Sequence, residues 1–229
     1  MTAEEKTALA RALDLADDYL RDGYAGAGRE YSFACDPPES AYLQGGLDSL
    51  EALGEEIRKC TACPLHKTRE RAVNGEGAAD PLVLILEDVS GEEDEEAGEL
   101  LDRMLRSIAL YRNTNCYLTS RVKCRPPAGE NPPGREEFAV CAPFLKRELV
   151  LLKPLAILVL EKTAKPGFQE AGDPLKNAGI PSFTISHPAL IQADEKLKRP
   201  AWEKLKALSS ILTGLDRDYA QSLGSTRGS

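Results

Sequence analysis

The sequence predicts an α/β fold: a three-layer α/β/α sandwich around a central, mostly parallel four-stranded sheet. Short, fully apolar runs alternate with longer amphipathic stretches along the middle of the chain. Such runs are typical of strands that are buried on both faces, and an amphipathic helix between two of them returns the chain to the same end of the sheet. With 229 residues, 42% of them hydrophobic, the chain can form one substantial core and a small appendage.

The apolar runs and the helical periodicities place the elements along the chain. Strands are expected at 82–86, 116–119, 155–160 and 182–185, and helices at 3–20, 47–59, 95–110, 135–152 and 202–212. Asp48 is expected to cap the second helix. We therefore divide the chain into an N-terminal helix and linker (1–46), a main α/β domain (47–215) and a C-terminal tail (216–229).

Polar residues follow three of the expected strands, at 87–91, 120–123 and 186–189. In a parallel sheet all these segments lie at the same edge, beyond the carboxyl ends of the strands, where α/β proteins bind their ligands. The chemistry of this protein is therefore expected at this edge.

Four cysteines, Cys60, Cys63, Cys124 and Cys141, form a close pair followed by two widely spaced single residues. Two close pairs would be typical of structural zinc, so an iron-sulfur cluster held by four thiolates is the better interpretation of this spacing. Unrelated buried or surface thiols are the alternative. Cys116 is expected in a strand and Cys35 in a loop.

The net charge of −8 argues against nonspecific binding along nucleic acid. Basic residues nevertheless cluster around Cys124 and in the C-terminal segment. The chain begins with Met-Thr-Ala-Glu-Glu and contains neither an apolar secretory segment nor an apolar run long enough to span a membrane. We expect a soluble, monomeric, cytoplasmic protein without disulfides.

Several motifs together resemble the iron-sulfur uracil-DNA glycosylases of family 4. They are Cys60-Thr-Ala-Cys63-Pro-Leu, Gly75-Glu-Gly, the block from Tyr117 to Pro127, Cys141-Ala-Pro-Phe-Leu, and Ser186-His-Pro188 followed by Trp202. The resemblance runs from about Ile57 to Leu212. It implies a 4Fe-4S cluster on the four cysteines, the glycosylase sandwich fold, and hydrolysis of the N-glycosidic bond of uracil or another deaminated base flipped out of DNA.

The resemblance also implies roles for individual residues. His187 matches the family histidine that lies near a carbonyl oxygen of the base, where a donor stabilises the leaving group. Leu190 or Ile191 would fill the gap left by the flipped base, or would alternatively anchor a loop. The DNA contacts are expected from Arg121, Lys123, Arg125, Lys198 and Arg199 in the basic segments.

Three departures from the family pattern affect the expected pocket. Leu86-Glu-Asp-Val-Ser90 stands where the family has Gly-Glu-Ala-Pro-Gly. Glu87 is the one residue of the family motif that is kept, and it is a candidate for catalysis and for substrate binding. The loop that carries the family's stacking aromatic residue is missing. Ser120 replaces the asparagine that reads the uracil edge, and its single hydroxyl should lower selectivity for uracil.

Asp88 is the third residue of this altered motif, the position at which family 1 glycosylases carry the aspartate that activates water. It could orient water here, or it could cap the following turn or helix. Two functions therefore stay open: a DNA-repair glycosylase with altered catalytic motifs, or an inactive or weak glycosylase fold that binds nucleic acid or a protein. The N-terminal arm could contact such a protein partner.

Overall fold

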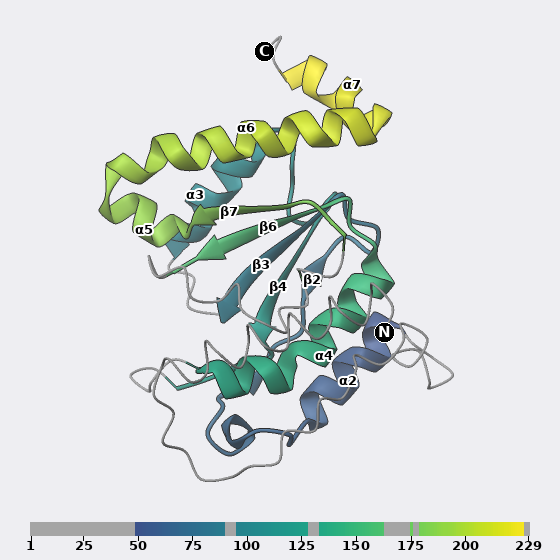
Figure 1. Cartoon of the computed structure of the whole chain (residues 1–229), viewed down its shortest axis with the longest axis vertical. Helices are drawn as coiled ribbons and strands as arrows, with labels where there is room; N and C mark the ends of the chain where they lie inside the picture. The colour runs from purple at the N-terminus through teal and green to yellow at the C-terminus, as the bar shows by residue number, and fades with distance from the viewer. Residues whose placement is uncertain (1–48, 90–94, 128–132, 163–174, 176–178, 227–229) are drawn as a thin grey trace, which may run out of the picture. The chain divides into compact units, whose positions relative to one another are not determined.

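The computed structural model describes residues 49–89, 95–127, 133–162, 175 and 179–226. The expected N-terminal helix and linker, Cys35 and the shortened loop after the first strand lie outside these residues. The described elements form a central sheet with helices on both faces (Figure 1). The α/β sandwich expected from the sequence is confirmed.

The central sheet has five strands in the order β2-β4-β3-β6-β7. Their bounds are β2 (Glu76–Gly77), β3 (Val83–Val89), β4 (Cys116–Val122), β6 (Ala156–Glu161) and β7 (Ser182–Ser186). The four longer strands are parallel and are the four expected ones, whereas β2 is a short antiparallel addition beside β4.

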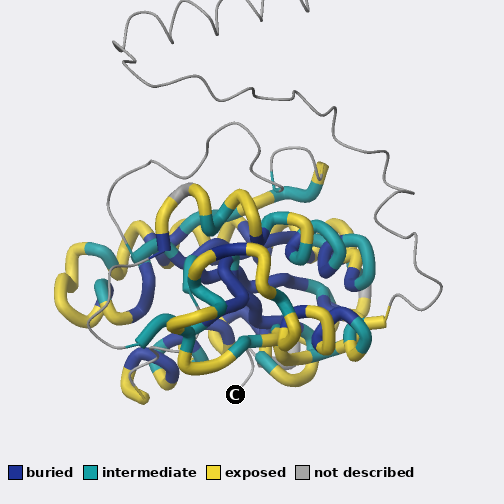
Figure 2. Tube along the Cα trace, turned by 90° about the horizontal axis from the view of Figure 1, so that it is seen from below, coloured by how far each residue is buried: buried dark blue, intermediate teal, exposed yellow. Residues whose placement is uncertain are grey.

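Strands β3 and β6 are buried on both faces over most of their length, as their continuous apolar sequences predict, whereas the edge strand β7 is only partly buried. In β3, Val83 and Ile85 pack into the core on one face, and Leu84 and Leu86 pack into the core on the other. Because successive side chains of a strand point to opposite faces, an unbroken apolar run suits a strand covered by helices on both sides. Figure 2 shows this buried centre in dark blue, surrounded by more exposed segments.

Helices α3 (Glu95–Arg106), α5 (Pro188–Ala193), α6 (Lys198–Leu215) and α7 (Arg217–Thr226) contribute to the core on one face. Helix α4 (Arg135–Leu152) covers the other face, and α2 (Leu50–Lys59) packs beside α4. None of the helices in the described part of the chain is long and apolar enough to cross a membrane.

Most elements begin or end a few residues away from the expected positions, and two of the differences affect how the helices are held. Helix α2 is capped by Ser49 instead of Asp48, because the Ser49 side chain accepts a hydrogen bond from the Ala52 backbone N–H at 3.2 Å. The expected C-terminal tail contains helix α7, where Tyr219 is 2% exposed and donates a hydrogen bond to the Ile108 carbonyl at 2.6 Å. This helix is therefore anchored in the core of the domain.

A second, two-stranded sheet lies next to the cysteine residues. Strand β1 (Arg71–Ala72) pairs antiparallel with β5 (Cys124–Arg125), so that Ala72 lies opposite Cys124. The short 3-10 helix η2 (Pro64–Lys67) precedes β1 and directly follows Cys63. This sheet fixes the segment after the first cysteine pair against the segment that carries the third cysteine.

Candidate active site at the carboxyl edge of the sheet

The carboxyl ends of the four parallel strands bring together the polar residues that the sequence places after them. The strand register puts Glu87 of β3 opposite Ser120 of β4, and Glu161 of β6 opposite Ser186 of β7. His187 follows β7 directly and begins the turn into α5. The edge predicted for chemistry thus carries carboxylates, a histidine and basic residues within one small region.

Glu87 and His187 form a buried pair at this edge. Glu87 Oε1 lies 3.7 Å from His187 Nε2, and both side chains are 2% exposed. This distance is too long for a hydrogen bond. Neither atom has a hydrogen-bond partner among the described residues, and buried polar atoms are normally paired. Two unpartnered polar atoms directed at one spot are typical of a site that receives a polar ligand.

The hydrogen bond of the other ring nitrogen determines which tautomer His187 adopts. His187 Nδ1 accepts a hydrogen bond from the Ala189 backbone N–H at 3.2 Å, which makes the imidazole the N-cap of α5. A nitrogen that accepts this bond carries no proton, so the proton of the neutral ring is on Nε2. His187 therefore carries its N–H donor on the nitrogen that lies 3.7 Å from Glu87 Oε1.

Asp88 and Arg121 form an ion pair on the neighbouring strands β3 and β4. Asp88 Oδ1 lies 3.4 Å from Arg121 Nε, and the two side chains are 18% and 11% exposed, in that order. Burial raises the pKa of Asp88, while Arg121, Lys162 and His187 act in the opposite direction. Asp88 lies inside β3, and α3 starts at Glu95, so the alternative of a cap for that helix does not apply.

Glu161 and Lys162 also belong to this edge, although the sequence interpretation did not include them. Burial is the main cause that raises the pKa of Glu161, and the negative charge of Asp88 adds to it. Lys162 lowers the pKa of Asp88. Glu161 is the last residue of strand β6 and Lys162 directly follows it, so the rule that located the other strand-end residues would have found them as well.

Ser120 does not offer its hydroxyl to a base. The side chain is 1% exposed, and its Oγ donates a hydrogen bond to the Val122 carbonyl at 2.8 Å. In this structure the single donor of the Ser120 side chain is therefore used by the backbone of the same strand, and substrate binding by Ser120 stays a prediction.

Lys123 is a correction to the sequence expectation, since it lies in the interior and not on a DNA-facing surface. It is 1% exposed, and its Nζ contacts Glu148 Oε2 and Thr119 Oγ1, each at 2.6 Å. The Glu148 side chain is 2% exposed as well. Buried charges require such partners, and a charge held in this way is not available to a phosphate.

The remaining candidates for DNA contact differ in how accessible they are. Arg125 is half-buried and lies 3.3 Å from Glu70, whereas Lys198 and Arg199 are exposed at the start of α6. Leu190 is half-buried on α5, but Ile191 is 1% exposed and packs into the core. Ile191 therefore corresponds to the loop-anchor alternative, and Leu190 alone remains as a wedge candidate.

The four cysteines of the expected cluster converge next to the two-stranded sheet. Cys63, Cys124 and Cys141 are buried, Cys60 is intermediate, and none forms a disulfide. Cys124 and Cys141 pack with Val122 against Phe138 and Leu65. The charges of Cys60 and Cys124 add to the effect of burial in raising the pKa of Cys63, so these sulfurs are close enough to interact.

The arrangement of the four cysteines can be compared with the ligands of a mononuclear zinc site and with those of a four-iron cluster. Within the described residues, no three Cys, His, Asp or Glu side chains converge as the ligands of a single ion would. The ligands of a mononuclear zinc site lie about 2.3 Å from one point. In a four-iron cluster each thiolate binds a different iron, so four separate thiols, three of them buried and one partly buried, fit that group in their donor chemistry.

One donor already points at a cysteine sulfur. Arg69 donates from Nη1 to Cys124 Sγ at 3.3 Å. Burial raises the pKa of Cys141 to about 11, so without a cation this thiol stays neutral at pH 7. A bound metal centre would hold it as the thiolate.

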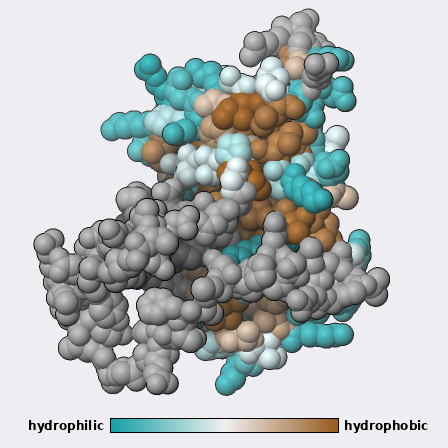
Figure 3. All heavy atoms as spheres, turned by 45° about the vertical axis from the view of Figure 1, so that its right-hand side comes forward, coloured by the Kyte–Doolittle hydropathy of each residue, from teal (hydrophilic) through white to brown (hydrophobic). Residues whose placement is uncertain are grey.

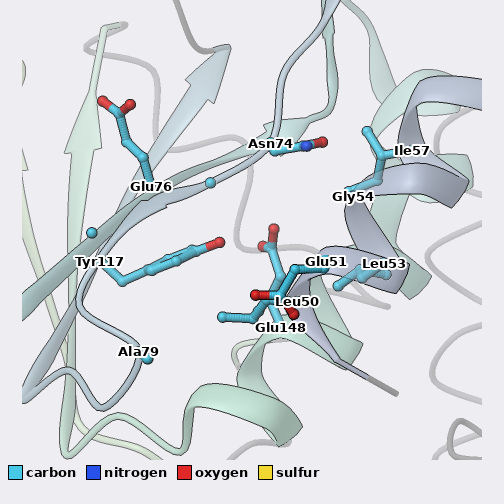
Figure 4. A pocket seen from close by; sticks show the side chains of 12 residues that line it. Leu50, Glu51, Leu53, Gly54, Ile57, Asn74, Glu76, Ala79, Tyr117 and Glu148 are labelled. Atoms are coloured by element: carbon cyan, nitrogen blue, oxygen red, sulfur yellow. The ribbon is translucent and has the colours of Figure 1, made fainter. Parts of the chain in front are cut away.

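A separate cavity of about 280 Å³ lies between α2, the segment 74–77 and the start of β4 (Figure 4). Tyr117 projects from β4 toward α2, and Glu51 and Glu148 lie on the same side of the cavity. Tyr117 is the second residue of β4, so this cavity is at the amino end of that strand. It is therefore distinct from the carboxyl edge that carries His187.

The fold, the strand-edge carboxylates and the histidine at the start of α5 define a protein of the uracil-DNA glycosylase class. The chain matches the family model "Uracil DNA glycosylase superfamily" over residues 66–206, and it belongs to this superfamily. The match begins within η2 and ends in the middle of α6.

Relatives of this chain carry the printed name type-4 uracil-DNA glycosylase. The protein of Thermotoga maritima is 31% identical over 186 residues, which cover 71% of this chain and 94% of that protein. The protein of Sulfurisphaera tokodaii is 33% identical over 189 residues, covering 72% and 86%. The protein of Pyrobaculum aerophilum is 38% identical over 119 residues, covering 48% and 60%.

Proposed function

We propose that this chain hydrolyses the N-glycosidic bond of uracil or another deaminated base in DNA. The observation that carries the proposal is the buried pair at the carboxyl edge: His187 presents an Nε2–H beside Glu87 Oε1, and neither atom has a partner among the described residues. The names of the related glycosylases support the same reaction.

The proposed reaction begins with a base that has left the DNA stack and entered the carboxyl edge. As the bond between base and sugar lengthens, negative charge develops on the carbonyl oxygen of the base. His187 Nε2–H is a neutral donor directed at this region, and it is held there because Nδ1 is fixed by the Ala189 N–H. A donor that is already in place stabilises that charge without having to reorganise.

Asp88 is the proposed carboxylate for the sugar side of the reaction. Its negative charge would stabilise the cationic sugar and orient the water that attacks the anomeric carbon. Arg121, 3.4 Å away, keeps the carboxylate oriented and opposes the effect of burial on its pKa. Glu87 is proposed as the polar group that accepts from the bound base.

We propose that the four cysteines hold a 4Fe-4S cluster, as the resemblance to family 4 implies. Cys60 would be supplied by the end of α2, Cys63 by the residue before η2, Cys124 by β5 and Cys141 by α4. When bound, the cluster would cross-link these four segments, and its chemistry would be structural. The carboxyl edge carries the proposed reaction separately.

The DNA contact is proposed for Lys198 and Arg199, with Leu190 on α5 as the apolar wedge. Helices α5 and α6 are joined by the 3-10 helix η3 (Glu195–Leu197), so these residues follow His187 within a short stretch of chain (Figure 1). Because the whole chain carries a charge of −8, this local positive charge would have to oppose a general repulsion of DNA.

We propose that the protein acts as a monomer in the cytoplasm.

The binding-module alternative is favoured by one observation, the engaged hydroxyl of Ser120. Since this hydroxyl bonds to the Val122 carbonyl, the position that reads uracil in the family offers no free donor here. In this alternative the protein binds DNA without hydrolysing an N-glycosidic bond.

Single-turnover excision separates the two functions. Protein prepared without oxygen is mixed in excess with single-stranded or duplex oligonucleotides that carry one uracil, hypoxanthine or xanthine, and abasic sites are cleaved and counted. If the protein is a glycosylase, abasic product is expected with at least one of these bases. Binding that depends on salt, with no product from any base, would support the alternative instead.

A further inference from the structure

Arg69 connects the end of helix α2 with one of the expected cluster ligands. It lies between η2 and β1, and its backbone N–H donates to the Leu65 carbonyl at 2.8 Å, which fixes the start of the side chain. Its guanidinium then donates in two directions: Nη1 to Cys124 Sγ at 3.3 Å, and Nη2 to the Arg58 carbonyl at 2.8 Å. The side chain is half-buried.

The second of these bonds holds the guanidinium in place. Arg58 is in the last turn of α2, where carbonyls lack partners within the helix. A planar guanidinium donates along fixed directions, so satisfying this carbonyl also fixes the direction of the bond to Cys124. Cys60 directly follows α2, and therefore the same side chain links the segments that carry Cys60 and Cys124.

A cationic donor acts differently on the two redox states of an iron-sulfur cluster. Four thiolates give the cluster a negative total charge, and reduction adds one more negative charge. A hydrogen bond from a positive group to a ligand sulfur stabilises the more negative state more strongly. Such outer partners of metal ligands tune the potential and help to retain the metal.

We propose that Arg69 is a positioning residue that raises the reduction potential of the cluster and slows its loss, through its bond to Cys124 Sγ. This inference rests on the proposed 4Fe-4S cluster, but it does not depend on glycosylase activity. Ala72 lies opposite Cys124 in the β1–β5 pair, so Arg69 approaches the ligand from a segment that the sheet already fixes.

The test compares Arg69→Gln and Arg69→Lys with Lys67→Gln in the full chain, purified without oxygen. Lys67 is exposed in η2, two residues earlier, so its substitution removes one positive charge from the same segment and serves as the control. The measurements are the cluster potential by spectroelectrochemical titration, and the rate at which a chelator removes iron.

Arg69→Gln is expected to shift the potential to more negative values and to accelerate iron release, while Lys67→Gln stays near the unsubstituted protein. Arg69→Lys, which keeps the charge but not the planar fork, should fall between them. If Arg69→Gln loses its cluster during purification, the reduction potential can still be measured in Arg69→Lys. Equal potentials for Arg69→Gln, Arg69→Lys and Lys67→Gln would overturn the inference. Unsubstituted protein without iron and sulfide would remove the cluster proposal itself, which is a different result.

Discussion

Glu87 Oε1 and His187 Nε2 lie 3.7 Å apart at the carboxyl ends of β3 and β7, and both side chains are almost completely buried. In the folded chain these residues are brought together by the parallel register of β3, β6 and β7. Their unpartnered atoms are the reason for placing the chemistry at this edge.

Replacing His187 by alanine should abolish most of the excision. Loss of one preorganised donor to a developing oxyanion costs about 10²- to 10³-fold in rate, and the same loss is expected here in single-turnover excision. His187→Asn is the matched variant, since a short amide can still cap α5. If His187→Ala excises at the unsubstituted rate while remaining folded, His187 has no role in stabilising the leaving base.

Asp88→Asn should slow excision by about 10²-fold, the lower end of the usual range for a positioned acid or base. The rate of the unsubstituted protein should rise with pH through the pKa of Asp88, because the carboxylate is the proposed active form. Burial raises that pKa, so the acid limb should lie above the ordinary range of aspartate. The pH dependence of single-turnover rates checks this, and an acid limb that persists in Asp88→Asn would assign it to another group.

The same substitution should stabilise the fold near neutral pH. A carboxyl whose pKa is higher in the folded than in the unfolded chain favours folding below its unfolded pKa, and this contribution is lost as pH rises through the folded pKa. Asparagine removes the buried charge and its pH dependence. Urea unfolding at pH 5 and pH 8 measures the effect, and a lower stability of Asp88→Asn at pH 8 would contradict it.

Lys123→Met should destabilise the protein by about 3–5 kcal/mol, because it leaves Glu148 buried without its cationic partner. The double variant Lys123→Met with Glu148→Leu should recover much of this loss. Thermal unfolding of the two variants, with exposed Lys206→Met as control, measures the difference. A small effect of Lys123→Met would show that Glu148 does not need this partner.

Lys198→Gln should weaken DNA binding similarly for all sequences and reduce the salt dependence of the affinity by about one unit of slope, as expected for the loss of one phosphate contact. Lys206→Gln is a close control: both lysines belong to α6, and each pairs with a glutamate three residues earlier. Identical slopes for the two variants would place the DNA contact elsewhere.

The sequence was sufficient for the four parallel strands, because β3 and β6 contain continuous apolar runs, and β4 and β7 are short segments rich in apolar and β-branched residues between helical stretches. It was not sufficient for β2, whose two residues are exposed and show no apolar pattern. This strand depends on Gly77, which has φ +134° and whose missing Cβ would lie 2.3 Å from the Cys116 carbonyl oxygen. Such a close backbone approach is a property of the folded chain.

The candidate site was predictable in its position but only partly in its contacts. Strand ends placed Glu87, Asp88 and His187 at one edge, and the same rule applies to Glu161. The burial of Lys123 was not predictable, since a lysine among other basic residues is typical of an exposed surface, and its partner Glu148 is contributed by a distant helix. The opposite case is found on α6, where the apolar residues Trp202, Ile211 and Leu215 are exposed. Figure 3 shows apolar and hydrophilic residues side by side on one face of the described part of the chain.

We propose above that the edge of the sheet around His187 removes a base from DNA by hydrolysis. The most direct measurement is the amount of free base released per molecule of iron-replete protein in one turnover, determined by mass spectrometry on a uracil-containing oligonucleotide. Free uracil is expected in equal amount to abasic DNA, and the rate of its release should fall steeply in His187→Ala. DNA that is bound but keeps all its uracil, with the cluster intact, would contradict it.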